Sequence, residues 1–260
     1  MGGKCDRPQN CLATSPLVSG LAHTVINRLI DTPAESRERR LEIATKILYS
    51  AITHEDRFDQ NALRQKLRGL RVNNDDLIDR CIGEAAAILG ENWLDDTLSF
   101  AEVSIGASNL MGLCREISTS SSNLKPSRNS QTILLATVLR EDHLIGPTLL
   151  AQKLRRNGHS VRVMNNSSPG EIARYIHRGN FDCLMLSAAS YGSLENAEQA
   201  IRLIRRGPCA HVPVVLGGAA LEFCGDAASS IGADLVTNDA HMALDLLQDT
   251  WGSTQVGAAE

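Results

Sequence analysis

The sequence predicts a protein of the α/β class in two parts, an N-terminal helical bundle and a C-terminal domain built on a doubly wound parallel sheet. Three observations predict it. Before residue 118, apolar residues recur every three or four positions, as in amphipathic helices. Residues 118–130 contain six serines and one proline, which indicates a linker. After the linker, short apolar runs alternate with helical patterns, as in successive βα units.

The composition is that of a folded globular chain. Of the 260 residues, 43% are apolar and 22% are charged, and the net charge of −4 provides no general basic surface for nucleic acid. No apolar run reaches the roughly 18 residues that a membrane span needs, and the first ten residues lack the apolar core of a secretory signal. The seven cysteines are scattered without a Cys-x-x-Cys pair, which favours a reducing compartment. We therefore expect a cytoplasmic protein with no membrane contact.

Five helices are expected in the first half, where a helical cap domain at 18–117 follows a flexible N-terminus at 1–17. Their ranges are 18–30, 39–53, 59–69, 75–89 and 97–117. Asn74 or Asp75 can cap the fourth helix, because a side-chain oxygen there accepts a hydrogen bond from an unpaired N–H of the first turn. The fifth helix should bury one apolar stripe, which consists of Phe100, Val103, Ala107, Leu110, Met111 and Cys114.

The second half predicts a domain at 131–250, followed by a flexible C-terminus at 251–260. The expected strands are 132–139, 160–164, 181–186, 212–216 and 233–236. The expected helices are 147–157, 170–178, 194–206, 219–230 and 239–249. Five βα units of this kind form a parallel, doubly wound sheet. Such sheets bind their ligands at the carboxyl ends of the strands, so the loops that follow the strands are the place to look for a site.

The loop after the first predicted strand holds a histidine with a carboxylate nearby. Glu141 stands two residues before His143 and can bond one imidazole nitrogen, which fixes the tautomer and raises the basicity of the other nitrogen. Gly146 lets the next helix begin close to a ligand. The whole loop reads Glu141-Asp142-His143-Leu144-Ile145-Gly146. Alone it is weak evidence, since most loop histidines are structural or solvated.

Small residues follow the third and fourth predicted strands. The third strand leads into Ser187, Ala188 and Ala189, and the fourth into Gly217 and Gly218. A glycine pair can simply make a tight strand-to-helix turn. Small residues at two strand ends, beside a carboxylate-backed histidine at a third, predict instead a deep slot.

These motifs together resemble those of cobalamin-binding proteins of the methionine-synthase and corrinoid-protein type. The family pattern is Asp-x-His-x-x-Gly, then Ser-x-Leu, then Gly-Gly. This chain has Glu141-x-His143-x-x-Gly146, then Ser187-Ala188-Ala189, then Gly217-Gly218, in the same order. The resemblance covers residues 35–249. It implies a helical cap over a flavodoxin-like (Rossmann-like) domain, with the corrin between them.

The resemblance also implies roles for single residues. His143 would be the lower axial ligand of cobalt in a base-off, His-on cobalamin, whether adenosyl-, methyl- or hydroxocobalamin. Glu141 and Ser187 would be its relay partners, with Glu141 standing where most of the family has Asp. Trp93 would cover the upper face of the corrin, unless it is a core tryptophan between helices. The remaining residues expected at the cofactor are Asp142, Leu144, Ile145, Gly146, Ala189, Gly217, Gly218 and Val103.

The string from Trp93 to Gly106 is similar to that of AerR/PpaA-type antirepressors of purple bacteria. Those are stand-alone cobalamin-binding regulators of photosystem genes that act on a partner repressor. Val103 and Ser104 occupy the positions at which related carotenoid-gene photoreceptors have an acidic residue and a histidine. The usual upper cobalt ligand is therefore missing, and His23 or His54 could replace it.

The resemblance thus implies a light-responsive, cobalamin-dependent transcriptional regulator of photosystem genes that is not an enzyme and meets DNA only within a complex. Two alternatives stay open. A corrinoid shuttle protein of a methyltransferase system would have the same two domains. A scaffold that has lost its cofactor would retain His143 without a role.

Overall fold

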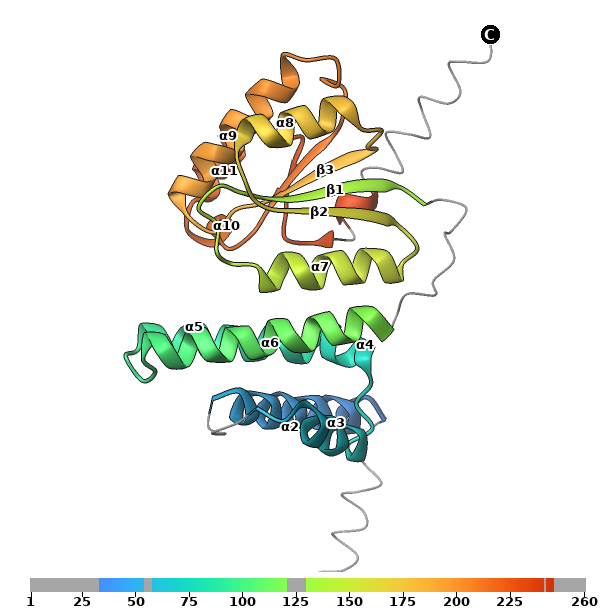
Figure 1. Cartoon of the computed structure of the whole chain (residues 1–260), viewed down its shortest axis with the longest axis vertical. Helices are drawn as coiled ribbons and strands as arrows, with labels where there is room; N and C mark the ends of the chain where they lie inside the picture. Colours follow the sequence, from blue (N-terminus) through green and yellow to red (C-terminus); the bar gives the residue numbers. More distant parts are fainter. Residues whose placement is uncertain (1–32, 54–57, 121–129, 241, 246–260) are drawn as a thin grey trace, which may run out of the picture.

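The structure is a computed structural model that describes residues 33–53, 58–120, 130–240 and 242–245 (Figure 1). The predicted helix at 18–30, both flexible termini, His23 and His54 lie outside the described residues, as does most of the predicted linker. Within the described part, no helix is both long and apolar enough to cross a membrane.

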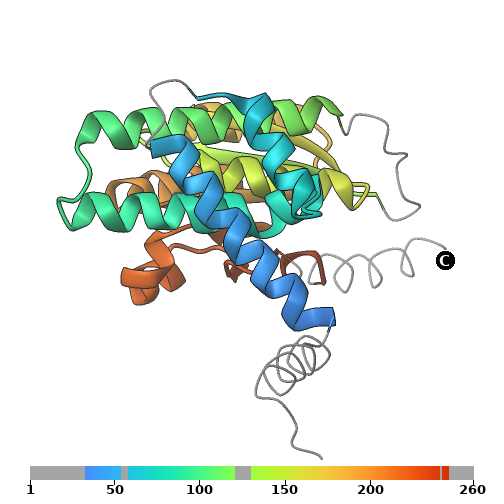
Figure 2. The ribbon, with the colours of Figure 1, turned by 90° about the horizontal axis from the view of Figure 1, so that it is seen from below.

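The N-terminal part is a stack of helices. They are α2 (Pro33–Thr53), α3 (Gln60–Gly69), α4 (Asn74–Asp76), the π-helical segment η1 (Leu77–Cys81), α5 (Ile82–Leu94) and α6 (Phe100–Ser120). Helix α2 crosses α5 and α6 on the side away from the sheet (Figure 2). Their apolar faces form one core, in which Leu48, Ile82 and Leu110 are fully buried. Within the described residues of the first half, the helical prediction is confirmed.

Several predicted boundaries of these helices differ from the structure. The expected helix at 75–89 is a run of α4, η1 and α5, and its N-cap is Asn73, whose side chain accepts from Asp76 N in a capping box. A capping box needs an N-cap residue and a second polar residue three positions later. The prediction of Asn74 or Asp75 considered the N-cap residue alone. Helix α6 continues to Ser120, past the predicted start of the linker at 118.

The predicted apolar stripe of α6 is wrong at its beginning. Phe100 is 75% exposed, whereas the buried apolar side chains of this helix lie further along the chain, at Leu110, Leu113, Cys114 and Ile117. Periodicity identifies the apolar face of a helix, but not how much of its length a neighbour covers. The first turns of α6 extend beyond the helices that cover the rest of it (Figure 1).

The C-terminal part is a five-stranded parallel sheet, as predicted. Its strands are β1 (Thr132–Val138), β2 (Ser160–Ser167), β3 (Cys183–Ser187), β4 (Val214–Gly217) and β5 (Leu235–Val236). Their order is β2-β1-β3-β4-β5, the doubly wound order of flavodoxin-like folds, and all four strand pairs are parallel. The carboxyl ends of β1 and β3 are neighbours, since Thr137 pairs with Ser187.

Helices cover both faces of the sheet because each strand buries alternate residues on opposite sides. Leu134 and Ala136 face α8 (Pro169–Arg178) and α9 (Tyr191–Arg205), whereas Ile133 and Leu135 face α7 (Ile145–Arg156). The predicted helix at 219–230 is instead two short helices, α10 (Ala220–Phe223) and α11 (Gly225–Ser230), because Cys224 leaves the helical conformation. Residues 240 and 242–245 are helical, and the remainder of the predicted 239–249 helix lies outside the described residues.

Helix α7 lies between the sheet and the helical part (Figure 1). Leu149 packs into the helical core, while Leu154 packs into the core beneath the sheet. Polar contacts add to this interface: Gln152 Nε2 donates to Cys114 O at 2.7 Å, and Arg156 pairs with Asp75 at 3.0 Å and with Asp79 at 2.6 Å. One helix therefore joins the two parts of the molecule.

Candidate functional site

Glu141 anchors the loop between β1 and α7. Its side chain is only 2% exposed, and both oxygens accept hydrogen bonds. Oε1 accepts from the backbone N–H of His143 at 3.0 Å and lies 2.7 Å from His143 Nδ1, while Oε2 accepts from the backbone N–H of Ala189 at 2.6 Å. Because Ala189 follows β3, this one carboxylate ties together the loops at the carboxyl ends of two adjacent strands.

The imidazole of His143 projects outward from this anchor, with its side chain 73% exposed. A carboxylate can only accept a hydrogen bond, so Nδ1 carries the proton and Nε2 of the neutral ring keeps a lone pair. The hydrogen bond to Glu141 raises the pKa of His143 above its ordinary value of 6.5. Burial acts to raise the pKa of Glu141, but the hydrogen bonds from His143 and Ala189 outweigh it, and this pKa lies below its ordinary value.

The rest of the predicted loop leads into α7. Asp142 is exposed, and Leu144 is the N-cap residue of α7. Ile145 begins the helix and packs against the helical core, whereas Gly146 is exposed. The loop therefore presents His143 to the outside while its next residues join the helical part.

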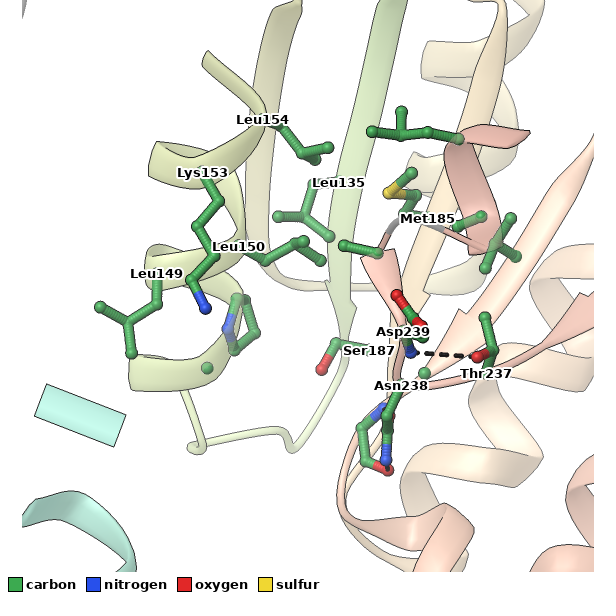
Figure 3. A pocket seen from close by; sticks show the side chains of 18 of the residues that line it. Leu135, Leu149, Leu150, Lys153, Leu154, Met185, Ser187, Thr237, Asn238 and Asp239 are labelled. Atoms are coloured by element: carbon green, nitrogen blue, oxygen red, sulfur yellow. Dashed lines mark hydrogen bonds between the residues drawn. The ribbon is translucent and has the colours of Figure 1, made fainter. Parts of the chain in front are cut away.

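A cavity of about 1100 Å³ opens beside this loop (Figure 3). Its walls are α7, one face of the sheet and residues 237–240, 243 and 244, and Asp79 and Gly83 of the helical part also line it. The interior is apolar, and its lining includes Leu135, Leu150, Leu154, Met185, Val215, Ala243 and Leu244. The structure brings four predicted site residues to this one cavity: Gly146, Ser187, Gly217 and Gly218.

Ser187 lines the cavity but is not among the groups that bond Glu141 or His143 in the described part of the chain. The second partner of Glu141 is instead the backbone N–H of Ala189. The sequence predicts Ala189 near the cofactor but not this hydrogen bond, because every residue except proline has a backbone N–H and the residue type does not show which one bonds.

The three glycines that line the slot are glycine for different physical reasons. Gly218 has φ +113°, and a Cβ there would lie 2.2 Å from Ala188 O. A Cβ at Gly217 would lie 2.9 Å from Thr237 O. These two residues are glycines because the chain itself passes close to them. At Gly146, by contrast, a Cβ would meet nothing within 4 Å. The chain itself therefore does not require glycine at this position, and a side chain would only occupy space beside α7.

Trp93 lies in the last turn of α5 and is 47% exposed, so its interpretation as a core tryptophan is wrong. Val103 is half-buried on α6. The turn between α5 and α6 projects beyond α7 on the side where the β1–α7 loop leaves the sheet (Figure 1). Large apolar residues gather around this turn, where Leu94 is 78% and Ile105 is 59% exposed.

Asn238 lies at the site but was not predicted from the sequence. It follows β5, and its side chain clamps the glycine turn: Oδ1 accepts from Gly218 N at 2.7 Å, and Nδ2 donates to Gly218 O at 3.3 Å. Like Thr237 and Asp239, it lines the cavity (Figure 3). The rule that ligands meet the carboxyl ends of parallel strands could have found it, had the rule been applied to the fifth strand.

The class of the C-terminal part follows from its match to a known family, because this fold alone serves many functions. Residues 131–247 match the family described as the B12 binding domain, and this part of the chain is a B12-binding domain.

Two known proteins resemble a larger part of the chain. An uncharacterised 20.5 kDa protein of Rhodobacter capsulatus, from the bchF–crtJ intergenic region, is 28% identical over 183 residues, which are 70% of this chain and 95% of the relative. The monomethylamine corrinoid protein of Methanosarcina barkeri has a structure that aligns with a TM-score of 0.61 and 16% identity, over 80% of this chain and 98% of its own. At that identity, the likeness concerns the fold alone, and it includes the helical part.

The residues present fit a cobalamin. An imidazole with one nitrogen fixed by Glu141 leaves Nε2 available for cobalt. The apolar cavity beside it has room for a nucleotide tail, and Gly146 keeps one wall open. The exposed Trp93 offers an aromatic surface on the same side of the molecule.

Gly218→Ala should lower the free energy of unfolding by about 1–3 kcal/mol, because an alanine cannot take its backbone conformation without strain and would meet Ala188. Urea denaturation followed by circular dichroism measures this change. Gly146→Ala is the matched control and should leave stability unchanged or raise it slightly, since it lies in a helix with open space beside it. Equal losses in the two variants would contradict this account.

Glu141→Gln should lower the pKa of His143 towards its ordinary value of 6.5, because the charge that stabilises the imidazolium is removed. In the parent protein, the raised pKa of His143 stabilises the fold fully below pH 6.5, and this contribution is lost as the pH rises through the raised pKa. The lowered pKa of Glu141 contributes fully above its ordinary value of 4.5, and this contribution is lost as the pH falls through the lowered pKa. NMR titration of the His143 ring protons measures the pKa of His143 in the parent and in the variant, both without cofactor. An unchanged His143 pKa would show that the hydrogen bond seen here is not formed in solution.

Proposed function

We propose that the protein binds cobalamin in the base-off form, with His143 Nε2 as the lower ligand of cobalt and the nucleotide tail in the cavity beside α7. The observation that carries this proposal is an exposed, carboxylate-bonded imidazole in the loop that leads to Gly146, which lines the cavity of a B12-binding domain. Glu141 orients the ring and holds the proton on Nδ1. Gly146 and Ser187 form part of the slot wall.

The helical part would cover the other face of the cofactor. Trp93 is exposed at the α5–α6 turn, and Val103 lies nearby on α6 without a group that can ligate a metal. When bound, cobalamin would supply a cobalt whose upper ligand can be exchanged or released by light. The side chains at the α5–α6 turn would then contact either a large or a small upper ligand. The position of the helical part would depend on which of the two is bound.

We propose further that the chain is a light-responsive regulator of transcription, not an enzyme, and acts as an antirepressor through a partner repressor, with DNA met only within that complex. The similarity of the Trp93 to Gly106 string to AerR/PpaA-type antirepressors supports it. So does the Rhodobacter capsulatus relative, whose gene lies in the bchF–crtJ intergenic region. A cytoplasmic location remains part of this proposal.

Helix α7 supplies a route from the slot to the surface of the helical part. Its residues Gly146 and Leu150 line the cavity, while Ile145 and Leu149 pack into the helical core. A ligand that shifts α7 must therefore disturb the helical part, whose outer surface a partner can contact.

The second candidate function is a corrinoid shuttle of a methyltransferase system. The fold likeness to the Methanosarcina barkeri corrinoid protein favours it, because that protein has a comparable helical part as well as the sheet. Both candidates require the same cobalamin site. They differ in whether the helical part responds to light.

Reconstitution with hydroxocobalamin tests the site. The visible spectrum of the parent protein should show histidine-ligated cobalt, and His143→Ala should lose that spectrum and weaken binding by more than about tenfold. His211→Ala, which removes an exposed histidine away from the cavity, is the matched control and should behave as the parent does. Cobalamin binding indifferent to His143 would refute the proposed ligation.

Hydrogen exchange in the adenosylcobalamin-bound protein tests the regulator against the shuttle. Backbone amides of α5 and α6 around Trp93 should lose protection on illumination, because the contact between the helical part and the upper ligand changes. Amides of α8, on the far face of the sheet, are the internal control and should not change. Identical protection in dark and light would refute light sensing, and methyl transfer to a partner enzyme would then favour the shuttle.

A further inference from the structure

Lys153 is a cation on the cavity wall that no described carboxylate neutralises. Its Nζ donates to the backbone oxygen of Asp79 at 3.3 Å, and it forms no ion pair within the described part of the chain. The other cation on this wall, Arg156, is bound by the carboxylates of Asp75 and Asp79. An ammonium group has three donors, so Lys153 retains donors for a ligand.

Lys153 lines the cavity, with its ammonium at the point where α7 meets the backbone of Asp79. It lies seven residues after Gly146 on the same helix, and helical side chains lean towards the N-terminus. In Figure 3, Lys153 Nζ is directed towards the N-terminal end of α7, which follows the His143 loop. Leu150 and Leu154 lie on the same helix and contribute to the apolar interior.

The charges on the opposite wall favour an anion on the α7 side. Glu222 of α10 and Asp239 after β5 line the cavity, and both are exposed. Asp79 lines the cavity on the α7 side, but its carboxylate is paired with Arg156. An anion entering the slot is repelled from Glu222 and Asp239 and attracted towards Lys153. The N-terminal end of α7 adds partial positive charge on the same side.

We propose that Lys153 binds the phosphodiester of the cobalamin nucleotide tail. This inference rests on the proposed function and adds to it the residue that recognises the anionic part of the ligand. The tail links the corrin to an uncharged base through a phosphate. If the base occupies the apolar interior, the phosphate would lie outside that interior, where the Lys153 ammonium on the cavity wall can bind it. Lys153 then distinguishes complete cobalamins from corrinoids that lack the phosphate.

The test uses the full-length protein and three corrinoids: cobalamin, cobinamide phosphate, which lacks the base, and cobinamide, which lacks both base and phosphate. Dissociation constants come from absorbance titrations. Lys153→Met should weaken the binding of cobalamin and of cobinamide phosphate by about tenfold and leave that of cobinamide unchanged. Lys153→Arg should restore most of the affinity, because it keeps the charge.

Lys46→Met is the matched control: it removes the same charge from an exposed position on α2, away from the cavity, and should bind all three corrinoids as the parent does. Raising the salt concentration should weaken cobalamin binding to the parent more than to Lys153→Met. Equal effects of Lys153→Met on all three corrinoids, or no effect on any, would overturn the assignment to phosphate while His143-dependent binding stands. Failure of the parent to bind cobalamin would instead refute the proposed function itself.

Discussion

The buried carboxylate of Glu141 is the constraint on which the site depends. A charged group shielded from water is costly unless hydrogen bonds compensate it, and here two N–H groups of His143 and one of Ala189 do so. The same bonds determine where the β1–α7 loop lies relative to the end of β3. They also decide which nitrogen of His143 carries the proton. A glutamate in place of the family's usual aspartate therefore still reaches the imidazole, and its second oxygen reaches a neighbouring strand end.

Helix α7 extends this constraint to the whole molecule. It begins where the Glu141 loop ends, lines the cavity with one face and packs into the helical core with another. Close-packed interfaces of this kind transmit small displacements, because they cannot absorb them by compression. The slot and the helical part are thus connected through a single rigid element. The ion pairs of Arg156 with Asp75 and Asp79 contribute to the same connection.

The interior and the edge of the slot are lined by different kinds of side chain. Apolar side chains from α7 and the sheet form its interior, while hydroxyl, amide and charged groups occupy the strand ends and the α7 rim. An uncharged ring is favoured inside by the removal of apolar surface from water, and polar groups are favoured at the edge. The glycine pair contributes less to this division than the motif suggests, since Gly217 and Gly218 are needed to let the chain pass Thr237 and Ala188.

The sequence by itself determined the two parts, the five βα units and the loop that carries His143, because periodicity and strand-end motifs are local properties of the chain. It also placed Gly146, Ser187, Gly217 and Gly218 at one edge, since parallel strands end together. Only the tertiary structure decided that Ala189 bonds Glu141, that Asn238 clamps Gly218 and that Phe100 and Trp93 are exposed. Backbone donors and the extent to which neighbours cover a helix depend on residues distant in the chain, so no local pattern encodes them.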